Sequence, residues 1–148
     1  MDGLIDGVSL QPLRAMHDER GAVLHMLRAD SPVMTGFGEI YFSEINPGVV
    51  KAWKRHHRMT QRLTVPVGRV RFVIFDDRTG SSSRGRLVEI EIGRPELYRL
   101  LVIPPLVWYG WKNLAATPSL VANCADLPHE PGEAEQSERV PGMPEYRW

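Results

Sequence analysis

Residues 48–78 read GVVKAWKRHHRMTQRLTVPVGRVRFVIFDDR. In this stretch, short apolar runs rich in β-branched residues alternate with polar residues and turn formers, a pattern typical of β-strands. We expect strands over Val49–His56, Gln61–Val67 and Arg69–Phe75, with a tight turn or bulge at Gly68. Residues 76–85, DDRTGSSSRG, have the composition of a loop. The stretch therefore predicts an all-β fold.

The same pattern continues on both sides of this stretch. Twelve prolines and thirteen glycines leave few windows long enough for a helix. Eight or nine short strands at this spacing predict a sandwich or barrel of antiparallel strands over residues 1–125. Residues 126–148 are polar and proline-rich and form a separate tail, whose terminal Tyr146 and Trp148 favour docking. The further expected strands are Gly21–Leu27, Gly38–Ile45, Leu87–Ile92, Leu97–Ile103, Leu106–Trp111 and Ser119–Ala125.

Composition narrows the class of protein. The 148 residues suffice for one domain with a hydrophobic core. Basic and acidic residues balance at 18 each, which argues against nucleic acid or an anionic membrane as a partner. No apolar run approaches the roughly 20 residues of a membrane span, and the N-terminus lacks the basic region of a signal peptide. Because Cys124 is the only cysteine, no internal disulfide forms, and we expect a cytoplasmic protein.

A concentrated positive charge lies between Lys51 and Arg62. Strand alternation puts Lys54 and His56 on the face of Val50, which we take as the interior, roughly 7 Å apart along the strand. Burial and a neighbouring imidazolium both lower the pKa of a lysine, and this makes it a usable base. The potentially cationic residues of this stretch are Lys51, Lys54, Arg55, His56, His57, Arg58 and Arg62.

Two other interpretations of this charge run remain open. It is also typical of a solvated edge strand whose charges prevent aggregation. A metal site is disfavoured because His56 and His57 face opposite sides of a strand, and Lys54 stands where a His-x-His pair needs its first histidine. We therefore expect neither a metal nor another cofactor.

Two further segments offer functional groups. Residues 103–111, IPPLVWYGW, carry aromatic rings that either belong to the core or stack on a flat ligand ring, and the Tyr109 phenol can transfer a proton. Residues 75–78, FDDR, form either a solvated turn or a charge-assisted pair in which Asp76 and Arg78 brace the pocket.

These segments together resemble the dTDP-4-dehydrorhamnose 3,5-epimerase family. The resemblance rests on residues 48–78, on IPPLVWYGWKNL at 103–114, and on the DERG turn at Asp18–Gly21, and it spans Asp18 to Ala125. It implies a cupin jelly-roll barrel, a homodimer, no required metal, and a sugar nucleotide bound near the barrel mouth.

The site of that family carries over only in part. Its Arg-Gly-Leu-His strand corresponds to residues 51–54, so Lys54 occupies the position of the basic histidine. The pocket lysine of the family falls at Gln61, and Tyr109 replaces a histidine in the segment that here reads WYGW. The catalytic tyrosine of the family, on the strand here at Ser119–Ala125, has no counterpart, and the C-terminal aspartate that partners the base has no assigned position.

The sequence is also similar to the dTDP-sugar 3,4-ketoisomerases. His56, Gln61 and Trp108 match residues of that family's pattern, whereas Lys54 and Tyr109 replace two of its histidines. The pattern lies between the two families.

Both resemblances imply removal of a proton next to a 4-keto group. We expect an epimerase acting at C3 or C5 of a nucleotide-diphosphate-linked 4-keto-6-deoxy sugar, with Lys54 or His56 as base and Tyr109 as acid. The alternatives are a 3,4-ketoisomerase on the same substrate class and a non-catalytic sugar-nucleotide-binding cupin. The expected substrate-binding residues are Lys51, Arg55, Arg58, Gln61, Arg62, Asp76, Trp108 and Trp111.

Overall fold

The computed structural model describes residues 3–148, which form twelve strands. None of the described segments forms a helix long and apolar enough to cross a membrane. The strands are β1 (Ser9–Pro12), β2 (Ala15–Asp18), β3 (Gly21–Leu24), β4 (Glu39–Ile45), β5 (Val50–His56), β6 (Gln61–Val67), β7 (Arg69–Phe75), β8 (Leu87–Gly93), β9 (Arg99–Ile103), β10 (Trp108–Asn113), β11 (Ser119–Ala125) and β12 (Ala134–Gln136).

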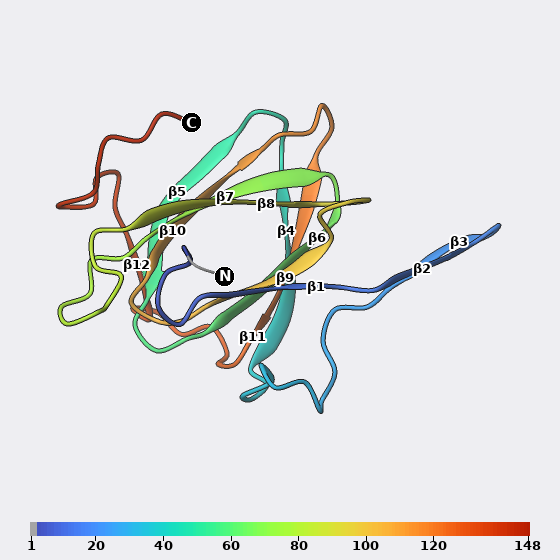
Figure 1. The fold of residues 1–148 in the computed structure, drawn as a ribbon, viewed down its shortest axis with the longest axis horizontal. Coiled ribbons are helices and arrows are strands. Elements are labelled where there is room, and N and C mark those ends of the chain that lie inside the picture. Colours follow the sequence, from blue (N-terminus) through green and yellow to red (C-terminus); the bar gives the residue numbers. More distant parts are fainter. Residues whose placement is uncertain (1–2) are drawn as a thin grey trace.

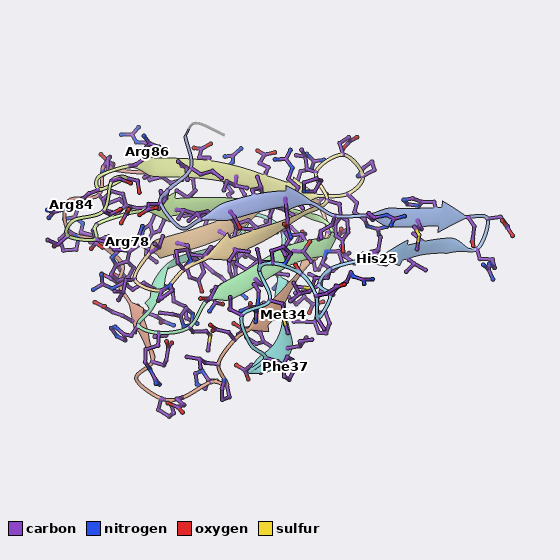
Figure 2. The ribbon with its side chains drawn as sticks, turned by 60° about the horizontal axis from the view of Figure 1, so that its bottom comes forward. His25, Met34, Phe37, Arg78, Arg84 and Arg86 are labelled. Atoms are coloured by element: carbon purple, nitrogen blue, oxygen red, sulfur yellow. The ribbon has the colours of Figure 1, made fainter. Side chains whose placement is uncertain are left out.

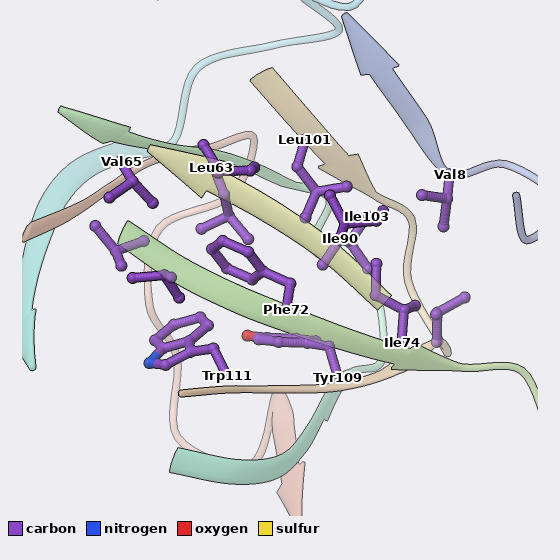
Figure 3. Close-up of a cluster of buried hydrophobic side chains, with 14 of the residues drawn as sticks. Val8, Leu63, Val65, Phe72, Ile74, Ile90, Leu101, Ile103, Tyr109 and Trp111 are labelled. Carbon is purple, nitrogen blue, oxygen red and sulfur yellow. The ribbon is translucent and has the colours of Figure 1, made fainter. Parts of the chain in front are cut away.

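Two five-stranded sheets form the body of the molecule (Figure 1). One sheet has the order β1-β9-β6-β11-β4 and the other the order β12-β5-β10-β7-β8, and neighbouring strands pair antiparallel. Side chains from both sheets meet in one core, where Leu63 and Leu101 of the first sheet approach Phe72 and Ile90 of the second (Figure 3). The expected all-β jelly-roll architecture is confirmed.

The turn between β6 and β7 shows why the sequence needs glycine there. Gly68 has a φ of 88°, a conformation that side chains rarely adopt. A Cβ atom at this position would lie 2.0 Å from the Ser119 hydroxyl oxygen, so only glycine fits. The predicted turn at Gly68 is thus present, and it brings β6 of one sheet next to β7 of the other in the chain.

The C-terminal tail packs onto the body of the same chain. Its β12 strand pairs with the edge of β5, where Ala134 lies opposite His56. Beyond β12, Tyr146 and Trp148 pack around the indole of Trp53, with ring centroids 6.3 and 5.2 Å from it. The tail therefore covers the outer side of β5 and brings its own residues close to the predicted site.

Strands β2 and β3 form a hairpin that projects away from both large sheets (Figures 1 and 2). The DERG turn at its tip is closed by Asp18, which accepts hydrogen bonds from the backbone and the guanidinium of Arg20. Two apolar side chains of the hairpin, Met16 and Val23, are 45% and 59% exposed.

Candidate active site

A β-bulge in β5 brings two lysines to the lining of one cavity. Lys54 lies opposite Tyr109 of β10, whereas the next pair joins Lys51 to Trp111, so three residues of β5 span two of β10. Strict alternation would have placed Lys51 and Lys54 on opposite faces. With the bulge, both line the same cavity.

His56, two residues beyond Lys54 on β5, is held by the buried side chains of Glu133 and Tyr109. Its Nδ1 atom is 2.6 Å from a carboxylate oxygen of Glu133, and its Nε2 atom is 3.2 Å from the Tyr109 hydroxyl. Glu133 also accepts the backbone N–H groups of Arg58 and Met59 at 2.7 and 2.8 Å. Because the ionised carboxylate accepts a hydrogen bond from Nδ1–H, the neutral ring carries its lone pair on Nε2.

The surroundings keep this histidine neutral. Burial lowers the pKa of His56 below its usual value, the hydrogen bond that His56 donates to Glu133 opposes this, and the nearby charge of Lys54 lowers the pKa further. Burial disfavours the charged form of Glu133, but its hydrogen bonds with the Arg58 backbone, His56 and the Met59 backbone outweigh this and lower its pKa. A neutral imidazole beside an ionised carboxylate is the arrangement of a general base.

The pKa values of Lys54 and Tyr109, which lie beside His56, respond to burial in opposite ways. Burial lowers the pKa of Lys54, while the charge of Glu133 acts to raise it. Burial raises the pKa of the Tyr109 phenol well above its usual range, so that it remains a hydrogen-bond donor. Figure 3 shows the Tyr109 ring beside Trp111 on the floor of the core.

Two cavities meet at this face, because both are lined by Tyr41 and Lys54. One, of about 320 Å³, extends over the bulge, and the other, of about 330 Å³, extends over His56. The lining residues of the first are Tyr41, Ser43, Lys51, Ala52, Trp53, Lys54, Tyr109, Trp111 and Gln136. Those of the second are Glu39, Tyr41, Lys54, His56, Met59 and His129.

The wall opposite β5 belongs to the other sheet. Tyr41 of β4 lies directly across from Asn123 of β11, and the Asn123 amide donates a hydrogen bond to the Tyr41 hydroxyl at 2.9 Å. The same amide donates to the side-chain oxygen of Gln61. Burial raises the pKa of Tyr41. Gln61, which was expected to line the pocket, therefore lies behind the pocket wall.

The structure places six expected substrate-binding residues outside these cavities, Gln61 among them. Arg55 lies on the opposite face of β5, where its guanidinium stacks 4.6 Å from the centre of the Trp108 ring and pairs with Glu135. Trp108 points to the same side and donates to Asp77 at 3.0 Å. The direction of both side chains follows from the alternation of faces along β5 and β10, which turns them away from Lys54.

Three further residues in this group have structural partners. Arg58 is exposed and pairs with Glu130. The buried Arg62 guanidinium donates to backbone carbonyls, including those of Val33 and Cys124, and so fixes the segment before β4. Asp76 is fully buried, and the expected pair with Arg78 forms at 2.8 Å, but it braces the loop after β7 rather than the pocket. Figure 2 shows Arg78 at that end of the molecule.

Tyr41, Glu133 and His129 had no place in the sequence-based prediction of the site. Tyr41 was detectable, because alternation along GEIYFSEI puts Glu39, Tyr41 and Ser43 on one face with the buried Ile45. Glu133 and His129 carried no such signal, since they lie in a tail without periodicity, and Glu133 is 77 residues from His56. Glu133 is thus an acidic partner of His56 that comes from the tail.

Among residues 3–148, no group of three or more histidine, cysteine, aspartate or glutamate side chains is arranged to hold a metal ion.

Comparisons with known proteins find relatives of this chain. No family model matches the chain. The chain is 32% identical over 126 residues to a probable low-salt glycan biosynthesis epimerase of Haloferax volcanii, covering 80% of this chain and 77% of that protein. It is 28% identical over 138 residues to a spore coat polysaccharide biosynthesis protein of Bacillus subtilis, covering 93% and 90% of the two chains.

Solved structures of nucleotide-sugar enzymes also resemble this chain. The crystal structure of a dTDP sugar isomerase from Desulfovibrio desulfuricans superimposes with a TM-score of 0.92 at 52% identity, over 96% of this chain and 91% of that one. A dTDP-4-dehydrorhamnose 3,5-epimerase from Elizabethkingia anophelis shares the fold, with a TM-score of 0.79 at 15% identity over 97% and 82%. The chain belongs to the dTDP-4-dehydrorhamnose 3,5-epimerase-like family of nucleotide-sugar epimerases and isomerases.

Proposed function

We propose that this protein epimerises a nucleotide-diphosphate-linked 4-keto-6-deoxy sugar at C3 or C5, in the synthesis of a surface polysaccharide or another glycan. The observation that carries the proposal is the buried histidine of β5, held by Glu133 at Nδ1 and facing a cavity shared with Lys54. Family membership supports the reaction class, and the cavity between the sheets has room for a sugar ring.

The proposed first step uses His56 as base and Lys54 as cation. The Nε2 lone pair of His56 takes the proton from the carbon next to the C4 ketone, displacing the Tyr109 hydroxyl that rests 3.2 Å away. The electron pair of the broken C–H bond moves into the ring, and negative charge develops on the C4 oxygen. The Lys54 ammonium, in the same cavity, stabilises that enolate.

The diphosphate requires cations near the reacting sugar. The three arginines among the expected substrate-binding residues have other partners, so we assign the diphosphate contact to Lys51. Its ammonium donates to the Glu44 carbonyl at 2.9 Å at the rim of the first cavity. The indole N–H of Trp111, in the same cavity wall, is buried and has no partner among residues 3–148. It is a second donor for the substrate.

One observation favours 3,4-ketoisomerisation as the second candidate. Tyr109 and His56 come from neighbouring strands of one sheet, and the Tyr109 hydroxyl is hydrogen-bonded to the His56 Nε2 atom. A proton taken and returned by this pair would stay on one face of the sugar, which suits a shift of the proton from one carbon to the next.

We further propose a cytoplasmic homodimer. Its support is an apolar strip on the outer side of the edge strand β4 and on the segment just before it. Ile40 and Phe42 of β4 are 55% and 62% exposed, and Phe37 before it is 63% exposed. The projecting β2–β3 hairpin adds Met16 and Val23 to the apolar surface available to a second copy. The reduced, buried Cys124 fits a cytoplasmic protein.

The proposed reaction is tested with dTDP-4-keto-6-deoxyglucose in D₂O, followed by proton NMR of the sugar. We expect deuterium at C3 or C5 together with inversion at that carbon. A product whose keto group has moved to C3 would establish the ketoisomerase instead. No exchange with dTDP-, CDP- and GDP-linked 4-keto sugars would refute both, and retained binding would then identify a sugar-nucleotide-binding cupin.

A further inference from the structure

Inversion needs a second proton-transfer group, and Tyr41 is placed to provide it. Tyr41 lies on β4, in the sheet opposite to the one that carries His56 on β5. Both side chains line the cavity of about 330 Å³, and Tyr41 also lines the cavity over the bulge. The volume of that cavity leaves room for a sugar ring against both the phenol and the imidazole.

The hydrogen bonds around Tyr41 leave its proton free for the cavity. The backbone N–H of Arg62 donates to the Asn123 side-chain oxygen at 3.2 Å, and this fixes which end of that amide carries the N–H groups. Those N–H groups are then directed to the Tyr41 hydroxyl oxygen and to Gln61. Since the phenol oxygen accepts here, its single O–H proton has no acceptor in this network.

The strand that supports this phenol is also informative. The 3,5-epimerase family carries its catalytic tyrosine on the strand that here is β11, and no tyrosine occupies residues 119–125. In this chain β11 supplies Asn123, and its register partner on β4 supplies the phenol. The phenol thus reaches the pocket from the neighbouring strand, one position along the same sheet.

We propose that Tyr41 is the catalytic acid of this enzyme and delivers its proton to the sugar face opposite His56. This inference rests on the proposed function and selects epimerisation over ketoisomerisation. After His56 has taken the proton from carbon, the Tyr41 O–H gives its proton to the same carbon from the other side, and the electron pair of the enolate forms the new C–H bond. The C4 ketone returns, and solvent carries the proton from the imidazolium back to the phenolate.

Tyr109 does not fill this role because of where it stands. It projects from β10, in the same sheet as His56, and its hydroxyl is 3.2 Å from the His56 Nε2 atom. Any proton it returns reaches the face from which the first proton was taken. Tyr109 is therefore a positioning residue for His56.

The experiment compares exchange with inversion in Tyr41→Phe, using dTDP-4-keto-6-deoxyglucose in D₂O. Without the phenol, His56 still removes the proton, exchanges it with solvent and returns deuterium on the same face. We expect inversion to fall by roughly 100-fold, while exchange with retained configuration persists. Tyr109→Phe slows both processes and leaves their ratio unchanged.

Tyr98→Phe is the matched control, because the buried Tyr98 hydroxyl donates to the His25 carbonyl away from the cavities. It leaves both rates unchanged. Normal inversion by Tyr41→Phe, or equal loss of exchange and inversion, would overturn the role of Tyr41 while the proposed function stands. Absence of exchange in the unaltered protein would refute the proposed function itself, and keto migration without inversion would overturn the inference and favour the ketoisomerase.

Discussion

At the scale of single residues, the site depends on how one imidazole is held. His56 is 5% exposed, and both of its nitrogens have partners within the protein. A buried histidine with a lowered pKa stays neutral at pH 7, and the Glu133 carboxylate directs its lone pair to Nε2. Lys54, expected from the sequence to stand at the position of the family's base, is as an ammonium better suited to stabilise the enolate.

Replacing Glu133 by Gln tests this orientation. The amide oxygen still accepts hydrogen bonds from the backbone N–H groups, but the amide no longer accepts one from the His56 Nδ1–H. Deuterium exchange at the sugar therefore falls by about 10²–10⁴-fold. Loss of the carboxylate also removes what raises the His56 pKa, so the inflection in the pH–rate profile moves to lower pH. Glu135→Gln, two residues along and paired with Arg55 on the outer face, serves as control and changes the rate little. An unchanged rate in Glu133→Gln would contradict the assignment.

Asp76 gives a prediction about stability instead of catalysis. Its buried carboxylate accepts hydrogen bonds from Arg78, Ser81 and Ser83, which together hold its pKa well below the usual range despite burial. Asp76→Asn leaves Arg78 without its partner, and we expect a loss of about 3 kcal/mol at pH 7.

The pH dependence of that loss has a definite sign. A carboxylate with a lowered folded-state pKa stabilises the fold above its unfolded-state pKa of about 3.9 and loses this effect as the pH falls below it. The stability gap between Asp76→Asn and the unaltered protein therefore narrows below about pH 4. Urea denaturation at pH 7 and pH 3 measures it, and a constant gap would refute the account.

At the scale of elements, the contact between β5 and β10 decides which residues enter the pocket. Gly110 lies between Tyr109 and Trp111, next to the bulge. A Cβ at this position would meet the Ala52 Cβ at 2.5 Å and the Trp148 ring at 3.1 Å. The bulge thus requires a glycine on the partner strand.

Gly110→Ala is expected to separate β5 from β10 and to disturb the docked tail. Overpacking of this kind costs about 1–3 kcal/mol, and because it displaces Lys54 and Tyr109 it also lowers the exchange rate. Thermal denaturation and the NMR exchange assay measure the two effects. If stability and activity both remain unchanged, the close packing at this position is not needed.

Most strands followed from the sequence, whereas the assembly of the site followed only in part. The β-branched, alternating run of residues 61–75 gave β6 and β7 with their observed bounds. The short β12 had no pattern of its own, because its pairing depends on the exposed edge of β5. The bulge beside Trp53 and the contact of Glu133 with His56 are long-range features that no local periodicity encodes.

At the scale of the whole molecule, the substrate pocket lies between two sheets and draws residues from the first half of the chain, from β10 and from the tail. A ligand that binds this folded arrangement alone stabilises it by mass action. A dTDP-sugar at 100 times its Kd is expected to add about 2.7 kcal/mol, visible as a raised melting temperature. Lys51→Ala weakens this shift at the same ligand concentration, and an equal shift in both proteins would place the diphosphate elsewhere.

The proposed dimer gives a second prediction at this scale. A charge on the apolar outer face of β4 opposes its burial in an interface. Phe42→Glu, at a side chain that is 62% exposed, therefore shifts the protein from dimer to monomer in size-exclusion chromatography with light scattering while its circular dichroism is unchanged. A dimer that persists in Phe42→Glu would assign the interface to another surface.

The central claim is that His56, held by Glu133, removes the proton next to the ketone. It is tested most directly by the rate of deuterium entry from D₂O into dTDP-4-keto-6-deoxyglucose, measured by NMR for the unaltered protein and for His56→Gln, with binding of the sugar nucleotide verified for both. The account predicts exchange at C3 or C5 with the unaltered protein and a rate about 10²–10⁴-fold lower with His56→Gln. Exchange at an undiminished rate in His56→Gln would contradict it.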